Sequence, residues 1–365
     1  TINCSANHEG GDKNMTNWNH IFSTLIRQSR PAYWGNWGLN MQIKPGAVGI
    51  IDTTSGDFRR VGDLPEVKVI DYPASSTWNL MSEHVSRQES TVNLDGSAVD
   101  PETQTKIEAG LEVKWGMEKA GSLASEFSLS NESTIDEAVI LENMDNLANM
   151  AASVNMGSKG NIAQGFGVIT GVLWADSGLN IGSNEDKSNF SIKGSVSGIN
   201  EMVGRATGKG SYISTTSDKS LNQHLWPAKS GSIAPTRVPI AYKFTSFDGR
   251  LKIPNWIMHL NSFKLVLINK PGCTYITKAR LTYNTPEGPH EREVTISGGL
   301  TETFGDIPLN SEMLKLHITF KGMINDDPYD FHWDKPLGEW LTGQRHIEMS
   351  GVWPGMTKCD DRERK

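Results

Sequence analysis

The sequence predicts an α+β, β-rich protein: an antiparallel, twisted sheet with a few helices, followed by a C-terminal β-sandwich. Three observations predict this class. The 36 glycines among 365 residues favour turns and strands over helical bundles. Polar and apolar residues alternate from Ile107 to Leu129, as they do in a half-buried strand. After Trp256, short strand-like runs recur at regular spacing, which is typical of a sandwich of about 100 residues.

The chain begins with a polar stretch, residues 1–15, which we expect to be a flexible N-terminus. Apolar residues three and four positions apart then predict a short helix from Trp18 to Ile26, capped by Thr16 or Asn17. Alternation and turn residues between Gly38 and Gly62 predict a hairpin.

The alternating run is long for one globular strand, so it either folds back at Lys119–Ser122 or belongs to a strand that can lengthen. Its apolar row consists of Leu111, Val113, Trp115 and Met117 and continues with Leu123 and Phe127. Its polar row contains Glu112, Lys114 and Glu118. Most runs of this kind belong to half-buried strands of soluble sheets. Alternating segments of about ten residues are also typical of strands that cross a bilayer in a barrel.

Three more elements complete the first domain. A capping box at Thr134–Glu137 predicts a long helix from Ile135 to Met156. Val168–Ala175 is apolar on both faces, which predicts a central strand, and Ile240–Phe244 is expected to close the domain. A region rich in Gly, Ser and Asn lies between these two strands. It holds a second, weaker alternating stretch whose apolar row is Phe190, Ile192 and Val196.

A turn-rich segment, Asp248–Pro254, is the best candidate for a linker. We therefore place a body at residues 16–248, a C-terminal sandwich at 256–356 and a charged tail at 357–365. The strands expected in the sandwich are Phe263–Ile268, Thr274–Tyr283, Glu291–Ser297, Leu314–Lys321 and His346–Val352.

Composition and motifs exclude several functions. A net charge of −7 gives no basic surface for nucleic acid, so no nucleic-acid partner is expected. The three cysteines form no metal motif. The acidic cluster Asp326, Asp327, Asp330 and Asp334 either binds calcium or is a solvated loop, and we predict no metal site. No hydrolase elbow, P-loop or dinucleotide motif is present, so we expect neither an enzyme nor a cofactor.

The last hundred residues resemble the C-terminal domain of the thiol-activated, cholesterol-dependent cytolysins. The resemblance rests on the order of Ile276–Tyr283, Ile307–Asn310, Leu314–Ile318 and Ile347–Gly355. Residues 16–247 are similar in layout to gasdermins, with a helix and hairpin followed by two alternating regions that flank a helix and a central strand. The cytolysin family's single Cys does not occur between Asn325 and Trp333, so cholesterol recognition is not carried over.

This resemblance implies a pore-forming cytolysin whose sandwich binds a membrane lipid or glycan receptor. The protein would be a soluble monomer, secreted or released, that assembles into a ring at the target-cell membrane. The residues expected to insert are Leu111, Val113, Trp115, Met117, Leu123, Phe127, Phe190, Ile192 and Val196. Those expected to touch the membrane or receptor are Tyr329, Phe331, Trp333, Trp340 and Trp353. The alternative is a non-lytic, lectin-like protein that binds lipid or carbohydrate.

Overall fold

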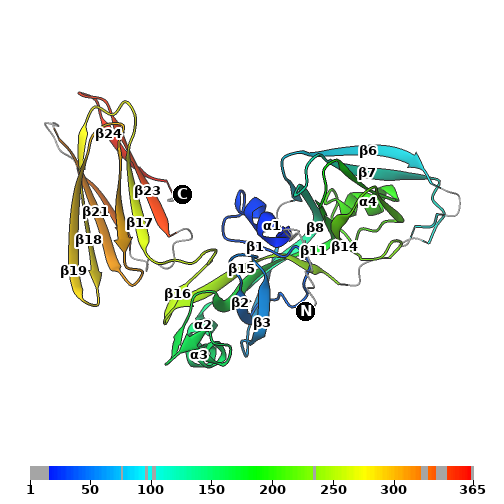
Figure 1. Cartoon of the computed structure of the whole chain (residues 1–365), viewed down its shortest axis with the longest axis horizontal. Helices are drawn as coiled ribbons and strands as arrows, with labels where there is room; N and C mark the ends of the chain where they lie inside the picture. Colours follow the sequence, from blue (N-terminus) through cyan, green and yellow to red (C-terminus); the bar gives the residue numbers. More distant parts are fainter. Residues whose placement is uncertain are drawn as a thin grey trace, which may run out of the picture.

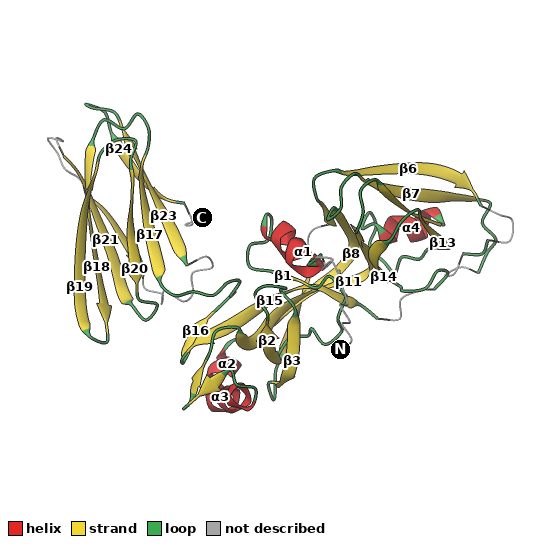
Figure 2. Ribbon diagram, viewed as in Figure 1, coloured by secondary structure: helices red, strands yellow, loops and turns green. Residues whose placement is uncertain are grey.

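The computed structural model describes residues 16–362, except 75–76, 95–97, 101–103, 233–235, 322–327 and 334–342. The fold is β-rich, with antiparallel sheets and few helices, as the sequence predicts. Figures 1 and 2 show a body that carries α1 to α4 and a separate sandwich at the other end of the molecule.

The predicted first helix is present as α1 (Trp18–Arg27), and Asn17 caps it by accepting a hydrogen bond from His20 N at 3.2 Å. The buried face of α1 packs on aromatic side chains of the body. Trp37 stacks on Trp18 with ring centroids 5.5 Å apart, and Phe22 meets Trp78 edge to face. This aromatic contact fixes the helix against one face of the main sheet.

The main sheet is built around β11 (Phe166–Ser183), which is buried along nearly its whole length and contains the predicted central strand. At the start of β11 its neighbours are β15 (Val238–Asp248) on one side and β2 (Ala47–Ile51) on the other. β1 (Trp34–Gly35) lies beyond β15, and β3 (Phe58–Asp63) lies beyond β2. Farther along, β11 pairs with β8 (Leu123–Ile135) and β14 (Leu221–Trp226), and β8 pairs with β4 (Val69–Pro73) and β5 (Trp78–Met81). The predicted closing strand lies within β15.

The predicted long helix is two short helices, α2 (Ala138–Glu142) and α3 (Met144–Ser153). Thr134 and Ile135 are not available for a cap because they are the last residues of β8 and pair with β4. Asn143 interrupts the remainder with non-helical dihedral angles. Strand pairing therefore overrides the local capping signal. The small strands β9 (Gly157–Ser158) and β10 (Asn161–Ile162) follow α3.

A second sheet lies against one end of the main sheet. It consists, in spatial order, of β13 (Ser214–Ser217), β12 (Ser188–Gly194), β7 (Ala109–Met117) and β6 (Val85–Asn93). Helix α4 (Val196–Met202) lies beside β12, and Figure 1 shows β6 and β7 running past it. The alternating run therefore folds back between Met117 and Leu123, which was one of the two alternatives for it.

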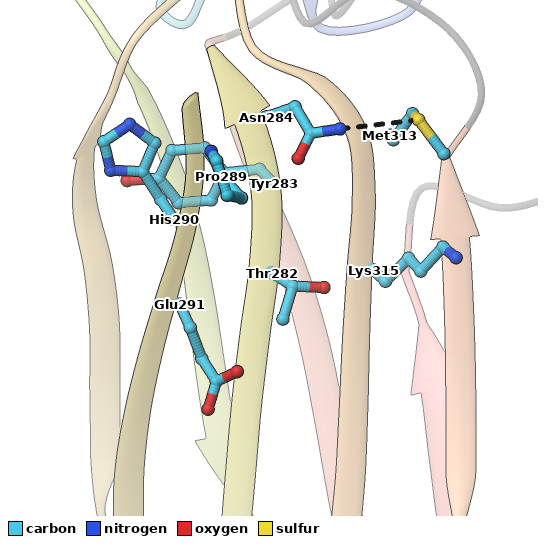
Figure 3. Close-up of a pocket in the computed structure, with 8 residues that line it drawn as sticks. All are labelled: Thr282, Tyr283, Asn284, Pro289, His290, Glu291, Met313 and Lys315. Carbon is cyan, nitrogen blue, oxygen red and sulfur yellow. Dashed lines mark hydrogen bonds between the residues drawn. The ribbon is translucent and has the colours of Figure 1, made fainter. Parts of the chain in front are cut away.

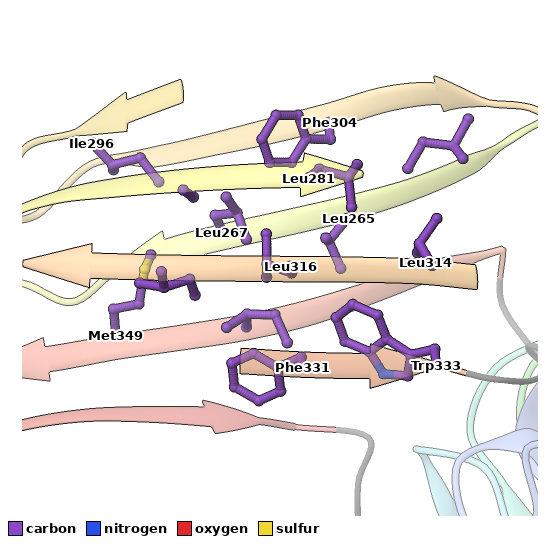
Figure 4. Close-up of a cluster of buried hydrophobic side chains, with 14 of the residues drawn as sticks. Leu265, Leu267, Leu281, Ile296, Phe304, Leu314, Leu316, Phe331, Trp333 and Met349 are labelled. Carbon is purple, nitrogen blue, oxygen red and sulfur yellow. The ribbon is translucent and has the colours of Figure 1, made fainter. Parts of the chain in front are cut away.

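The sandwich packs two sheets around an apolar core (Figure 4). One sheet has the order β20 (Thr301–Ile307), β17 (Phe263–Asn269), β23 (Gln344–Gly351), β24 (Thr357–Asp361). The other has the order β19 (Gly288–Ile296), β18 (Ile276–Thr285), β21 (Glu312–Lys321), β22 (Tyr329–Trp333). Residues 357–361 of the predicted charged tail instead form β24, because their backbone pairs with β23 and Asp361 accepts a hydrogen bond from Arg345 Nε at 2.8 Å.

The segment expected to be a linker continues the body. β16 (Leu251–Ile253) turns back and pairs with β15. Trp256 is buried in the body core, where it stacks on Trp34, and its carbonyl accepts from Trp34 Nε1 at 2.7 Å. The strands of the sandwich begin only at Phe263.

Candidate functional site

The second sheet repeats the strand order of the end of the main sheet that it covers. The strands β5, β8, β11 and β14, here called the basal strands, pair in that order. The strands β6, β7, β12 and β13, here called the folded-back sheet, pair in the matching order. Along the chain β5 leads into β6, β7 into β8, β11 into β12 and β13 into β14. Each strand of the folded-back sheet is thus a continuation of one basal strand.

We call the segment that joins a basal strand to its continuation a corner, and we call β7–β8 and the neighbouring β11–β12 the central pair. The central pair keeps one register across its two corners. Leu123 pairs with Gly182 in the basal strands, and Met117 pairs with Ser188 in the folded-back sheet, six residues farther on each strand. Backbone bonds hold the same register within the corner. Ser183 N donates to the Ser122 carbonyl at 2.9 Å, and Lys187 N donates to the Glu118 carbonyl at 3.1 Å. Straightening both corners would therefore give one long antiparallel ladder without any slip in register.

The corners of the outer strands, β5–β6 and β13–β14, are shorter than those of the central pair, and both are shorter by the same number of residues. Between Met81 and Val85 the chain advances four residues, whereas the partner strand advances seven, from Ala124 to Met117. The same difference, four against seven, separates the pairs Leu221–Ser183 and Ser217–Phe190 on the other side. Straightening all the corners, which we call extension, would thus shift the pairing register of each outer strand with its neighbour by three residues and leave the register of the central pair unchanged.

An apolar core fills the space between the two sheets. Val113, Trp115, Met117, Phe190 and Ile192 of the folded-back sheet are all buried there. Ile199 and Met202 of α4 join them, together with Ala124, Leu179 and Ile181 of the basal strands. The opposite face of the folded-back sheet is polar and carries the ion pair Lys193–Glu112 at 3.4 Å. The central pair is therefore amphipathic across both of its strands.

Several predicted inserting residues lie elsewhere in this structure. Leu123 and Phe127 face α1 on the far side of the basal strands, because the corner reverses which residues point inward. Leu111 is half-buried at the margin of the core. Val196 is not on a strand: it begins α4, whose N-cap is the Ser195 side chain, and it is half exposed.

The predicted aromatic contacts of the sandwich divide in the same way. Phe331 and Trp333 are not exposed; they stack with ring centroids 5.8 Å apart in the sandwich core (Figure 4). Tyr329 is half-buried and donates its hydroxyl to the Thr357 carbonyl at 2.5 Å. Trp340 lies outside the described residues. Trp353 is 64% exposed. Of the predicted contact residues that the structure describes, it is therefore the most accessible to a partner.

Residues around Trp353 that the sequence analysis missed form an apolar end of the sandwich. Its large exposed side chains are Ile276, Leu300, Val352, Trp353 and Met356, and we call this set the tip. The loops that carry them touch one another: Trp353 N donates to Thr274 Oγ1 at 2.7 Å, and Tyr275 donates to the Gly355 carbonyl at 2.7 Å. An apolar run in a Pro-Gly turn, Val352–Met356, is the signal that could have revealed it.

The tip lies at the end of the sandwich away from the body. The body joins at the start of β17, whereas the tip loops follow the ends of β17, β19 and β23. β17 and β23 run parallel, and β19 ends beside the start of β18. All of these chain ends therefore meet at the distal edge. Clustered exposed apolar side chains at such an edge mark an interaction surface.

The placement of Phe331 makes a testable prediction. Replacing Phe331→Leu keeps the core apolar but loses aromatic contact with Trp333, so we expect the free energy of unfolding to fall by about 1–2 kcal/mol. Phe331 is a predicted membrane contact, but because its side chain is buried, the vesicle binding that the resemblance implies should not change. Thermal unfolding and vesicle flotation measure the two effects. Loss of vesicle binding in a folded variant would contradict the buried placement.

A hollow of about 360 Å³ lies near the other end of the sandwich (Figure 3). It is lined by Thr282, Tyr283, Asn284, Pro289, His290, Glu291, Met313 and Lys315. Tyr283 and His290 stack on each other, and Asn284 donates to Met313 Sδ at 3.6 Å, so these side chains contact one another along the strands. In the described ranges, no group of three or more metal-ligating side chains is found. None of the described helices is long and apolar enough to cross a membrane.

No family profile and no curated protein matches the chain. Among solved structures it is similar to pneumolysin, at 9% identity over 90% of this chain and 87% of that chain, with a TM-score of 0.22. A disulfide-locked mutant of intermedilysin with human CD59 gives 9% identity over 90% of this chain and 86% of that chain, with a TM-score of 0.22. The membrane-binding domain of pneumolysin covers 28% of this chain and 97% of its own length, at 15% identity and a TM-score of 0.20.

These proteins are cholesterol-dependent cytolysins, the family that the C-terminal sequence resembles. The likeness of the body to gasdermins stays a prediction. At TM-scores of 0.20 to 0.22 the likeness carries no weight for function, which has to be inferred from the geometry of this chain.

Proposed function

We propose that the protein is a pore-forming cytolysin that acts without enzymatic turnover. The observation that carries the proposal is the unbroken register of the central strand pair across its corner. The packing of two sheets against each other does not by itself require the corners of two neighbouring strands to be equal in length. Equal corners allow β7–β8 and β11–β12 to become two long neighbouring strands whose hydrogen bonds already match.

Extension of the closed form seen in this structure would turn the part of the core that the folded-back sheet supplies into a membrane surface. The row Val113, Trp115 and Met117, with Phe190 and Ile192 on the neighbouring strand, would leave α4 and face lipid. Glu112 and Lys193 on the opposite face would face water. Because backbone groups in hydrocarbon need partners, many copies would have to close into a barrel. The lipid-facing row comes from the central pair, since β6 and β13 carry mainly polar side chains.

The sandwich would hold the protein on the membrane through the tip. Trp353 and Met356 can enter the interface between lipid headgroups and acyl chains, where Trp is favoured. In this proposal a soluble, secreted or released monomer binds a lipid or glycan of the target-cell membrane, assembles side by side into a ring, and then extends. The tip also suits a lipid- or carbohydrate-binding protein that never inserts, which is the second candidate.

Dye release from liposomes separates the two candidates. A cytolysin should release trapped dye from vesicles that it binds, and electron microscopy of those vesicles should show rings. Vesicle binding without dye release and without rings, over a panel of lipid compositions, would favour the non-lytic candidate.

A further inference from the structure

A buried carboxylate joins the basal strands to the folded-back sheet. Glu126, in β8, is fully buried. Its Oε1 accepts hydrogen bonds from Arg87 Nε of β6 at 2.8 Å and from Trp115 Nε1 of β7 at 2.8 Å. Both donors belong to the folded-back sheet, so the contact spans the interface that extension would open. Its Oε2 is buried and has no hydrogen-bond partner within the described part of the chain.

A short chain of charges surrounds this carboxylate. Arg87 also pairs with Glu89 of β6, and Glu89 Oε2 accepts from Arg205 Nη1, just after α4, at 2.6 Å. Basal neighbours of Glu126 across the ladder are Asn79 of β5 and Leu179 of β11, which carry no charge. Within the described residues, the charged groups that act on Glu126 are Arg87 and Arg205, with Glu89 paired to both of them, and the packed helix α4 carries one further charged residue, Glu201.

The closed form holds this charge in an unfavourable place. Removing a carboxylate and a guanidinium from water costs free energy that their attraction often fails to recover, above all when one carboxylate oxygen lacks a partner. The surroundings are the apolar side chains of the inter-sheet core. Burial raises the pKa of Glu126 above its usual value even though Arg87 and Trp115 act to lower it.

Extension would return Glu126 to water. On a straight strand from β7 through β8, alternate positions share a face, and Glu126 falls on the same face as Glu112, Lys114 and Glu118. That is the face that the proposed pore turns toward water. Val113, Trp115 and Met117 fall on the other face.

We propose, on the basis of the proposed function, that the Glu126–Arg87 pair keeps the closed form metastable and favours its extension. Glu126 is a positioning residue: it does not touch the membrane but biases which arrangement the strands adopt. The pair is well placed to fix the position of the folded-back sheet, and it is better solvated once that sheet has left the basal strands.

The double variant Arg87→Met/Glu126→Gln tests this inference. It removes both charges and keeps an acceptor for Trp115. We expect the melting temperature of the monomer in solution to rise by a few degrees and dye release to slow about tenfold, while vesicle binding is unchanged. The matched control is Lys278→Met/Glu293→Gln, which removes an exposed ion pair of the sandwich and should alter neither quantity.

A lower or unchanged melting temperature would overturn the proposal, and so would an unchanged rate of release from a more stable variant. The comparison of melting temperatures needs no membrane, so it measures the free-energy cost of the Glu126–Arg87 pair whether or not the wild type releases dye. Absence of dye release by the wild type would refute the proposed function instead.

A pH profile gives a second measurement if the double variant does not fold. Because the pKa of Glu126 is raised in the closed form, that form binds the proton more tightly than the unfolded chain does. The stability of the wild type relative to Glu126→Gln should therefore increase as pH falls through that raised pKa, and level off below about 4.3. Parallel profiles of the two proteins would overturn the proposal.

Discussion

A disulfide between positions 183 and 188 is expected to abolish dye release and to do so reversibly. In the closed form the hydroxyl oxygens of Ser183 and Ser188 lie 2.6 Å apart and buried, one at the end of β11 and the other at the start of β12. Two cysteines there meet the spacing of a disulfide with little movement of the backbone. In an extended strand, five residues would separate the same positions by about 16 Å, far beyond a disulfide's reach.

The oxidised variant Ser183→Cys/Ser188→Cys should therefore bind vesicles, and even assemble, without releasing dye. Reduction should restore release to the level of the reduced wild type. Titration of free thiols shows whether the bond has formed, and the single variant Ser183→Cys controls for the loss of the serine hydrogen bonds. Full release by the oxidised protein would exclude straightening of this corner, and with it the proposed pore.

The alternating run shows what a sequence pattern can and cannot predict. The period of two correctly places Val113, Trp115 and Met117 on one buried face. It cannot show that Leu123 and Phe127 face the opposite side of the basal strands, because the corner at residues 118–122 changes the inward-pointing set. Nor can it predict the matched register, since that depends on pairing with a strand about 60 residues later in the chain.

Neighbouring residues also misled the prediction in the sandwich. Tyr329, Phe331 and Trp333 alternate, and that spacing is typical of a strand with one buried face. Their acidic neighbours suggested an exposed loop, but β22 pairs with β21 and turns Phe331 and Trp333 into the core. Of the tip, only Trp353 was predicted, because the apolar residues come from three loops distant in sequence that the folded chain brings together.

Removing the two largest exposed side chains of the tip should uncouple the protein from membranes. Trp353 is 64% exposed and Met356 is 91% exposed, so the closed monomer gains little from either. Each side chain should contribute about 1.5–3 kcal/mol when it enters an apolar phase. The variant Trp353→Ser/Met356→Ser should thus bind vesicles about 10²–10⁴-fold more weakly, with an unchanged melting temperature.

Met313→Ser is the matched control, since Met313 is a similarly exposed methionine at the opposite end of the sandwich. Vesicle flotation over a range of lipid concentrations measures the affinity, and dye release should fall in proportion to the bound protein. Equal weakening by Met313→Ser would place the membrane contact away from the tip. Normal affinity of the tip variant for vesicles would contradict docking through Trp353 and Met356. Weaker binding with a normal amount of dye release per bound molecule would show that the tip acts in docking and not in the extension of β7 and β12.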